Sequence, residues 1–165
     1  MIPILMLNGP NLNLLGAREP GIYGIETLEQ IAARLSPVAR ELGVELHWEQ
    51  RNGEGELIDL LHGAAHWASG VVFNPGAYSH YSYAIADAIA AISTPVIEVH
   101  LSNIYAREHY RRRSVISPVA SGVISGVGAL GYELGLRAAV ELALRAGPKG
   151  GSLGALRPHE QTEKG

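Results

Sequence analysis

The feature of this sequence that most constrains its fold is the regular alternation of short apolar runs with longer segments of helical periodicity. The apolar runs, which are candidate β-strands, lie at residues 2–7, 44–49, 70–74, 96–99 and 122–125. A strand–helix–strand order of this kind is typical of a parallel sheet that helices cover on both faces. The sequence therefore predicts an α/β fold with a sheet of about five strands.

The second candidate strand differs in pattern from the others. Apolar side chains at positions 44, 46 and 48 alternate with polar ones at 45, 47 and 49. One face of this strand should therefore contact water, which favours a place at the edge of the sheet. The other four runs lack this alternation, and we expect them to be covered on both faces.

Two of the predicted helices carry recognisable start signals. Thr27 and Gln30 have the spacing of a capping box and precede an apolar stripe. Pro37 lies within that stripe and should kink the helix. The next helix is predicted over residues 54–67, with Asn52 as its N-cap.

The predicted elements fit into one domain. Two further helices are expected over about residues 79–92 and 129–145. A chain of 165 residues with 47% hydrophobic content is long enough to bury one continuous core. We assign residues 1–146 to this domain. Residues 147–165 lack periodicity and are rich in glycine and charged residues, which predicts a disordered tail with no role in chemistry.

The composition argues against several classes of protein. The 13 Lys and Arg against 16 Asp and Glu give a net charge of -3, which is unlike a general nucleic-acid binder. The chain has no cysteine, so it forms no disulfides or thiolate metal sites, and we expect it in the cytoplasm. The apolar opening is too short to span a membrane and is interpreted as a strand, so no membrane association is expected.

Polar residues cluster after three of the predicted strands. In an open parallel sheet, ligands bind at the carboxyl ends of the strands, near the point where the strand order reverses. The loop over residues 8–24 carries Asn11, Arg18 and Tyr23, and shorter polar loops cover 74–80 and 98–103. The long loop is either a lid over a site or an ordinary surface loop, and the residues alone leave both readings open.

Five stretches in these regions resemble type II 3-dehydroquinases. They are LNGPNLNLLGAREPGIYG, NGEGELID, FNPGAYSHYSYAIADAI, PVIEVHLSNIYARE and SPVASGVISGVGALGY. The resemblance extends from about Ile4 to Ala146, and it implies a flavodoxin-like three-layer sandwich with sheet order 2-1-3-4-5. It also implies the anti elimination of water from 3-dehydroquinate, through an enolate, to give 3-dehydroshikimate in the third step of the shikimate pathway. No metal or cofactor is expected.

The resemblance also assigns catalytic roles. Tyr23 is the base, His100 the acid, Arg18 the lid arginine that assists the phenolate, Asn11 the organiser of the enolate hydrogen bond, and Glu98 the residue that orients His100. An anti elimination needs a base and an acid on opposite faces of the ring. A phenol has an ordinary pKa of about 10, so it needs a nearby cation such as Arg18 or Arg107 to act as a base. Without the resemblance, Tyr23 and His100 would be interpreted as a packed loop tyrosine and a hydrogen-bonded structural histidine.

Substrate binding is assigned in the same way. The backbone amides near Leu101 and Ser102, with the Ser102 hydroxyl, are expected around the substrate carboxylate, where preformed donors suit an anion. The remaining binding residues implied by the resemblance are Asn74, His80, Arg111, Arg107 and Asp87.

Asp87 is expected to act in a neighbouring subunit. His80 and Asp87 are seven positions apart on one predicted helix, so they share a face away from its apolar stripe. The family uses this aspartate across a trimer interface, and its trimers assemble into dodecamers. We therefore expect a homododecamer, a tetramer of trimers.

Three residues depart from the family pattern. Arg51 replaces a serine, Ala86 an arginine and Tyr81 a threonine. None of them is a catalytic group, so the departures bear on trimer contacts and substrate affinity rather than on the reaction type.

The sequence leaves three alternative functions. Residues 126–131 fit the GxGxxG nucleotide-binding pattern, but they lie outside the first strand–helix unit, and tight turns with close helix packing explain their glycines better. A zinc site at His62 and His66 lacks the HExxH glutamate and a nearby third ligand. A noncatalytic interaction protein on the same fold is the third alternative.

Overall fold

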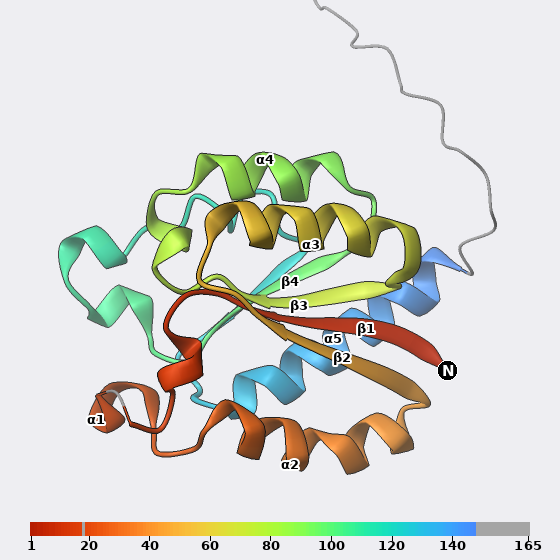
Figure 1. Ribbon diagram of the computed structural model, residues 1–165, viewed down its shortest axis with the longest axis horizontal. Coiled ribbons are helices and arrows are strands. Elements are labelled where there is room, and N and C mark those ends of the chain that lie inside the picture. Colours follow the sequence, from red (N-terminus) through yellow and green to blue (C-terminus); the bar gives the residue numbers. More distant parts are fainter. Residues whose placement is uncertain (18, 148–165) are drawn as a thin grey trace, which may run out of the picture.

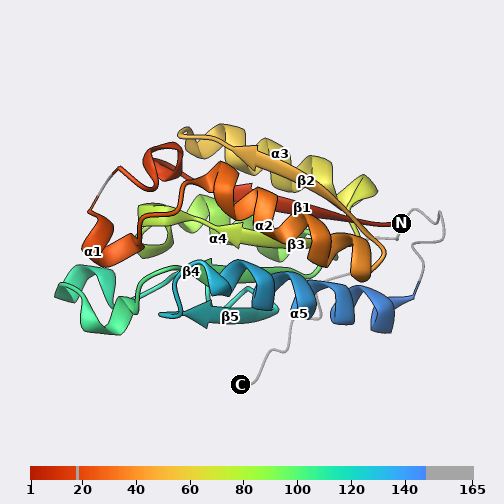
Figure 2. The ribbon, with the colours of Figure 1, turned by 90° about the horizontal axis from the view of Figure 1, so that it is seen from below.

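The computed structural model describes residues 1–17 and 19–147. Its five parallel strands have the order β2-β1-β3-β4-β5, with α3 and α4 on one face of the sheet and α2 and α5 on the other (Figure 1). Turning the molecule brings α2 and α5 in front of the sheet (Figure 2). The predicted three-layer α/β fold and its strand order are therefore confirmed.

The elements have the following bounds. The strands are β1 Ile2–Asn8, β2 Val44–Gln50, β3 Gly70–Asn74, β4 Val96–His100 and β5 Gly122–Ser125. The α-helices are α1 Pro20–Tyr23, α2 Leu28–Glu41, α3 Glu54–Trp67, α4 Tyr83–Ala91 and α5 Leu130–Ala146. Short 3-10 helices are η1 Leu12–Leu14, η2 Gly76–His80, η3 Ile104–Ala106 and η4 His109–Arg111. The predicted strands agree with the observed ones to within one residue at each end.

Two apolar clusters hold the layers together. Ile31 and Leu35 of α2 pack with Leu136 of α5 on one face of the sheet. Leu57 of α3 and Ile85 of α4 pack on the other face. Each helix buries one apolar stripe, so both faces of the central strands are dry.

The start of α2 agrees with the prediction. Thr27 Oγ1 accepts a hydrogen bond from the Gln30 amide at 3.2 Å, and Gln30 Oε1 accepts one from the Thr27 amide at 2.9 Å. This is the predicted capping box. Pro37 lies inside the helix, which continues through it to Glu41.

The predicted cap of α3 is wrong by one residue. Gly53 is the N-cap, and its amide donates to Glu56 Oε2 at 3.2 Å. Asn52 instead uses its Oδ1 to accept from the Asn11 amide and from Gln50 Nε2, both at 3.0 Å. The asparagine thus ties α3 to the first loop rather than capping the helix.

The third predicted helix is also corrected. Residues 76–80 form the 3-10 helix η2, and α4 begins only at Tyr83. The Ser82 side chain accepts from the Ile85 amide at 3.1 Å, so it supplies a cap at that point. His80 and Asp87 therefore do not lie on one helix, and the prediction that they share a helix face is wrong.

The two edges of the sheet differ. β2 lies at one edge, as predicted from its alternating pattern. β5 was expected to be covered, but none of its residues is buried, and Val123 is 43% exposed. The reason is its position at the other edge, where it pairs with β4 alone among the described strands.

Across residues 1–17 and 19–147, none of the helices combines the length and the apolar character needed to cross a membrane. The predicted disordered tail lies outside the described residues from position 148 onward.

Candidate functional site

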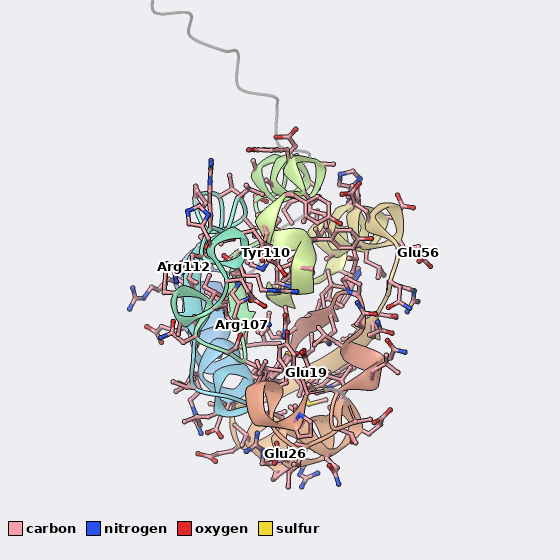
Figure 3. The ribbon with its side chains drawn as sticks, turned by 90° about the vertical axis from the view of Figure 1, so that its left-hand side faces the viewer. Glu19, Glu26, Glu56, Arg107, Tyr110 and Arg112 are labelled. Atoms are coloured by element: carbon pink, nitrogen blue, oxygen red, sulfur yellow. The ribbon has the colours of Figure 1, made fainter. Side chains whose placement is uncertain are left out.

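The predicted site residues gather at the carboxyl end of the sheet. A pocket opens there, beside the switch in strand order between β1 and β3. Nearly all the predicted residues line it: Asn11, Tyr23, Asn74, His80, His100, Leu101, Ser102, Arg107 and Arg111. Figure 3 looks at this edge of the molecule, with Arg107 between the segment that carries Tyr110 and the segment that carries Glu19.

Two of the predicted residues that the structure describes do not line this pocket. Glu98 lies behind His100 and is fully buried. Asp87 is exposed on α4, away from the pocket lining. Arg18 lies outside the described residues.

His100 and Glu98 form a buried pair at the end of β4. His100 Nε2 lies 2.6 Å from Glu98 Oε1, and the histidine is only 5% exposed. A strand turns alternate side chains to the same face, so residues two apart can meet in this way. If Nε2 carries the hydrogen it donates to the carboxylate, and Nδ1 is then the ring nitrogen available to the pocket.

Two serines complete the surroundings of Glu98. Ser114 Oγ donates to Oε1 at 2.6 Å, and Ser117 Oγ donates to Oε2 at 2.5 Å. Burial raises the pKa of Glu98, but the hydrogen bond and charge of His100 and the two hydroxyl donors outweigh it, and the net effect lowers the pKa. Glu98 is therefore an ionised, fixed acceptor at neutral pH.

Sequence reasoning missed Ser114 and Ser117. They lie in the loop before β5, sixteen and nineteen positions after the glutamate that they contact. Serine is common in loops, and no spacing rule connects this loop with the interior of β4. Only the folded chain shows what these hydroxyls do.

Tyr23 and Arg107 form a second pair on the rim of the pocket. Arg107 Nη1 donates to the Tyr23 hydroxyl at 2.9 Å, and the guanidinium carbon lies 5.3 Å from the centre of the tyrosine ring. Burial lowers the pKa of Arg107, but the hydrogen bond and charge interaction with Tyr23 outweigh it and raise the pKa. A cation at this distance stabilises negative charge on the phenolic oxygen.

Asn11 is positioned through its backbone. It adopts a left-handed conformation with φ of 66°, which asparagine tolerates better than most residues. Its amide donates to Asn52 Oδ1, and Gln50 Nε2 donates to the same oxygen and to the Gly9 carbonyl. The loop is thereby tied to the end of β2, and Asn11 lines the pocket.

His80 and Arg111 bring further polar groups to the pocket. His80 Nδ1 lies 2.8 Å from the Arg113 carbonyl oxygen, and burial, with the nearby cationic groups, lowers its pKa. Arg111 is held by Glu108 at 3.4 Å and by Tyr110, whose hydroxyl accepts from Arg111 Nε at 3.1 Å. Because Arg107 and Arg111 both line the pocket, its field favours an anionic ligand.

The glycine-rich motif at residues 126–131 has packing reasons for its glycines. A Cβ at Gly126, whose φ is 91°, would lie 3.0 Å from Asn103 Cβ. A Cβ at Gly131 would lie 3.3 Å from Val99 Cγ1 in β4. The motif thus forms a tight turn and allows α5 to pack close to the sheet.

The alternative zinc site at His62 and His66 lies on the surface. His62 and His66 are exposed on α3. Within the described ranges, no three His, Cys, Asp or Glu side chains gather in a way that could hold a metal ion.

A doubly wound α/β domain with a cationic, acid–base-rich pocket at its switch point belongs to the class of small-molecule enzymes. The family model described as dehydroquinase class II matches residues 2–140. The chain therefore belongs to the class II dehydroquinase family.

Individual relatives agree with this assignment. The chain is 63% identical over 140 residues to the 3-dehydroquinate dehydratase of Pelotomaculum thermopropionicum, covering 85% of this chain and 97% of the relative. Identity to the enzyme of the same name in Bacillus subtilis is 56% over 133 residues, covering 81% and 90%.

Solved structures show the same fold. The type II dehydroquinase of Butyrivibrio crossotus matches with a TM-score of 0.81 and 44% identity, covering 84% of this chain and 97% of that one. The type II dehydroquinase of Propionibacterium acnes matches with a TM-score of 0.81 and 48% identity, covering 87% and 97%.

Proposed function

We propose that this chain is a lyase that removes water from 3-dehydroquinate to give 3-dehydroshikimate, the third step of the shikimate pathway. The observation that carries the proposal is the presence of two separate acid–base pairs in one cationic pocket. Tyr23 with Arg107 forms one pair, and His100 with Glu98 forms the other. Family membership and the names of the close relatives support the same reaction. The domain of residues 1–146 contains all the proposed site residues.

The first step of the proposed mechanism is proton abstraction next to the ketone. Tyr23 acts as a phenolate, and the guanidinium of Arg107 at 2.9 Å stabilises that charge. Arg18, from the same loop, is proposed to bring a second positive charge over the substrate. The products of this step are an enolate and a neutral tyrosine.

Asn11 is proposed to stabilise the enolate. Its place in the pocket lining brings a neutral polar side chain to the site, where it can donate directly or through a water molecule. A preorganised donor aimed at developing negative charge lowers the barrier without reorganising. The ties from Gln50 and Asn52 to this loop provide that preorganisation.

Loss of the hydroxyl completes the elimination. His100 is proposed to protonate the leaving oxygen from Nδ1, because Nε2 is committed to Glu98. The ionised carboxylate stabilises the imidazolium before transfer and fixes the orientation of the ring. The carbon–oxygen bond breaks, the electrons of the enolate form the new double bond, and water leaves.

The remaining residues are proposed to hold the substrate. The amides near Leu101 and Ser102 and the Ser102 hydroxyl would bind the carboxylate, with Arg107 Nη1 3.5 Å from that hydroxyl. The substrate hydroxyls would then meet the other polar lining residues, namely Asn74, His80 and Arg111. An anionic polyol suits a pocket that combines cations with neutral polar groups.

We further propose that the chain works in the cytoplasm as a homododecamer built from trimers. Asp87 is exposed on α4, outside the pocket of its own subunit. This placement supports a role for Asp87 at a neighbouring site, where a carboxylate would order arginines. Arg51, Tyr81 and Ala86, which depart from the family pattern, would adjust these contacts.

The test is the formation of dehydroshikimate from dehydroquinate by the purified protein, followed by ultraviolet absorbance, with EDTA and borohydride in parallel samples. Turnover that survives both treatments supports an enolate mechanism, because borohydride would trap a lysine imine. Replacing His100 with Gln should lower kcat by at least about 100-fold, as expected for loss of a general acid. No turnover by folded wild-type protein would contradict the proposal.

A further inference from the structure

We infer that Tyr132 is a positioning residue for the proposed reaction, because its buried hydroxyl fixes which way the Asn74 amide faces in the pocket. Tyr132 lies in the first turn of α5 and does not line the pocket. The expected effect on turnover rests on the proposed function, whereas the orientation of the Asn74 amide does not. Asn8, Tyr132 and Asn74 form a chain of donors and acceptors that has only one consistent assignment.

The chain begins at Asn8, the last residue of β1. Its Nδ2 donates to two backbone carbonyls, those of Met6 and Glu49, both at 3.2 Å. These two contacts use both amide hydrogens and fix the orientation of the side chain. Asn8 Oδ1 is therefore an acceptor only, and it faces Tyr132.

The next group is the Tyr132 hydroxyl, which has a single hydrogen. It donates to Asn8 Oδ1 at 2.6 Å. The same oxygen lies 3.1 Å from Asn74 Nδ2, and because its hydrogen is already used, it must accept there. The nitrogen of the Asn74 amide is thus directed inward to Tyr132.

The other end of the Asn74 amide agrees with this assignment. The Gly76 amide donates to Asn74 Oδ1 at 3.2 Å. If the Asn74 side-chain amide were flipped, its Nδ2 hydrogens would face the hydrogen of the Gly76 N–H. Its Oδ1 would then face the Tyr132 oxygen, which has no hydrogen left to donate. Either mismatch would leave a buried polar group without a hydrogen bond, which carries the free-energy penalty of its lost hydration. Only one orientation satisfies both neighbours.

The surroundings keep this network intact. Asn8 and Tyr132 are fully buried, and Asn74 is 4% exposed. Asn8 and Asn74 are register partners on β1 and β3, so they stand side by side at the switch point of the sheet. Burial raises the pKa of Tyr132, and its hydroxyl stays protonated throughout the working pH range.

The consequence for the pocket is a donor of fixed polarity. One hydrogen of Asn74 Nδ2 points to Tyr132, which leaves the second for a ligand in the pocket that Asn74 lines. A substrate hydroxyl then meets a donor that does not have to reorient. Preorganisation of this kind lowers the cost of binding and of reaching the transition state.

The test is a double-mutant cycle with Tyr132→Phe and Asn74→Ala, measured as dehydroshikimate formation. The phenylalanine keeps the ring, so we expect a loss of about five- to tenfold in kcat/KM, seen mainly in KM. Asn74→Ala should lose more, and the double variant should lose no more than Asn74→Ala alone. Additive losses, or full activity in Tyr132→Phe, would overturn the inference.

Tyr83→Phe is the matched control. It removes the hydroxyl of a tyrosine that is 63% exposed and lies outside the pocket lining, so activity should be unchanged.

A second measurement does not depend on turnover. In wild-type protein the Asn74 side-chain amide should give two distinct proton resonances, one of them slow to exchange with water, and both should move in Tyr132→Phe. Unchanged Asn74 signals would refute the positioning role. Shifted signals in a protein without dehydratase activity would support it while the proposed function failed.

Asn8→Ala serves if Tyr132→Phe does not fold. Without Asn8 Oδ1, the tyrosine hydroxyl becomes free to donate to Asn74, so the Asn74 amide signals should again move. The absence of any change in a folded Asn8→Ala protein would count against the inference in the same way.

Discussion

At the scale of single residues, the buried carboxylate of Glu98 fixes the surroundings of His100, the proposed acid. His100, Ser114 and Ser117 all lie within 2.6 Å of its oxygens. With these three hydrogen-bond partners around it, the buried carboxylate of Glu98 stays ionised near neutral pH. The histidine consequently always faces the same negative charge.

This arrangement predicts how Glu98→Gln changes the pH dependence of stability. The folded-state pKa of Glu98 is lowered below its ordinary value of 4.5, so the stability that it contributes is present above that pH and is lost as the pH falls through the folded-state pKa. Urea unfolding should show Glu98→Gln less stable than wild type at pH 7, by roughly 2 to 3 kcal/mol. The difference should narrow as the pH falls below 4.5 and the carboxylate takes up a proton. A difference independent of pH would show that Glu98 is not held as an anion.

A second residue-scale prediction concerns Arg107, whose guanidinium contacts the Tyr23 hydroxyl. Arg107→Met keeps an apolar side chain of similar reach but removes the charge, so kcat should fall by about 10- to 100-fold. Arg113→Met, at an exposed position outside the pocket lining, is the control and should behave as wild type. Equal rates for the two variants would remove Arg107 from the mechanism.

At the scale of elements, the packing of α5 against the sheet depends on glycine. A Cβ at Gly135 would lie 2.9 Å from Val99 Cγ2 and 3.0 Å from Val72 Cγ1. Gly63 in α3 is also helical, but a Cβ there meets nothing within 4 Å. Substitutions at Gly63 and Gly135 therefore distinguish the effect of helix propensity from the effect of packing on stability.

Alanine at these positions should have opposite effects on the free energy of unfolding. Gly63→Ala should stabilise the protein by about 0.5 to 1 kcal/mol, the propensity difference between the two residues. Gly135→Ala has the same propensity gain but should destabilise by about 1 to 3 kcal/mol, because two β-branched side chains must move. Thermal unfolding of both variants would check this, and a stabilised Gly135→Ala would refute the close approach of α5.

Most of the strands and helices could be predicted from the sequence. Five strands and their order followed from hydrophobic patterning and family resemblance, because burial imposes a period on every element. The start of α4 was misplaced, since Ser82 is a cap only when the preceding residues are already folded into η2. The exposure of β5 escaped prediction because its four residues carry no alternation to reveal an edge.

The residues of the candidate site could also be predicted only in part. Residues in the stretches that resemble the family, such as Tyr23, Asn74 and His100, could be assigned to the site from that resemblance, and they line the pocket. Ser114 and Tyr132 could not, because their partners lie sixteen and more than fifty positions away. Contacts of that kind depend on how layers pack, and local patterns do not encode them.

At the scale of the whole molecule, the proposed assembly makes a complementation prediction. Asp87→Ala should lose activity if the neighbouring site needs the carboxylate, and Tyr23→Phe should lose activity within its own site. Mixing the two variants after partial denaturation and refolding should restore activity, since some sites would pair an intact Tyr23 with an intact Asp87. Sedimentation should show dodecamers throughout. No recovery in properly mixed assemblies would place Asp87 outside any active site.

The proposed mechanism depends on Tyr23 as the base of an enolate-forming dehydration. The most direct measurement is the initial rate of dehydroshikimate formation by wild-type protein and by Tyr23→Phe, with thermal unfolding of both. The proposed mechanism predicts robust turnover by wild-type protein and a loss of at least about 1,000-fold in kcat in Tyr23→Phe, at unchanged stability. Substantial turnover by a folded Tyr23→Phe protein would contradict it.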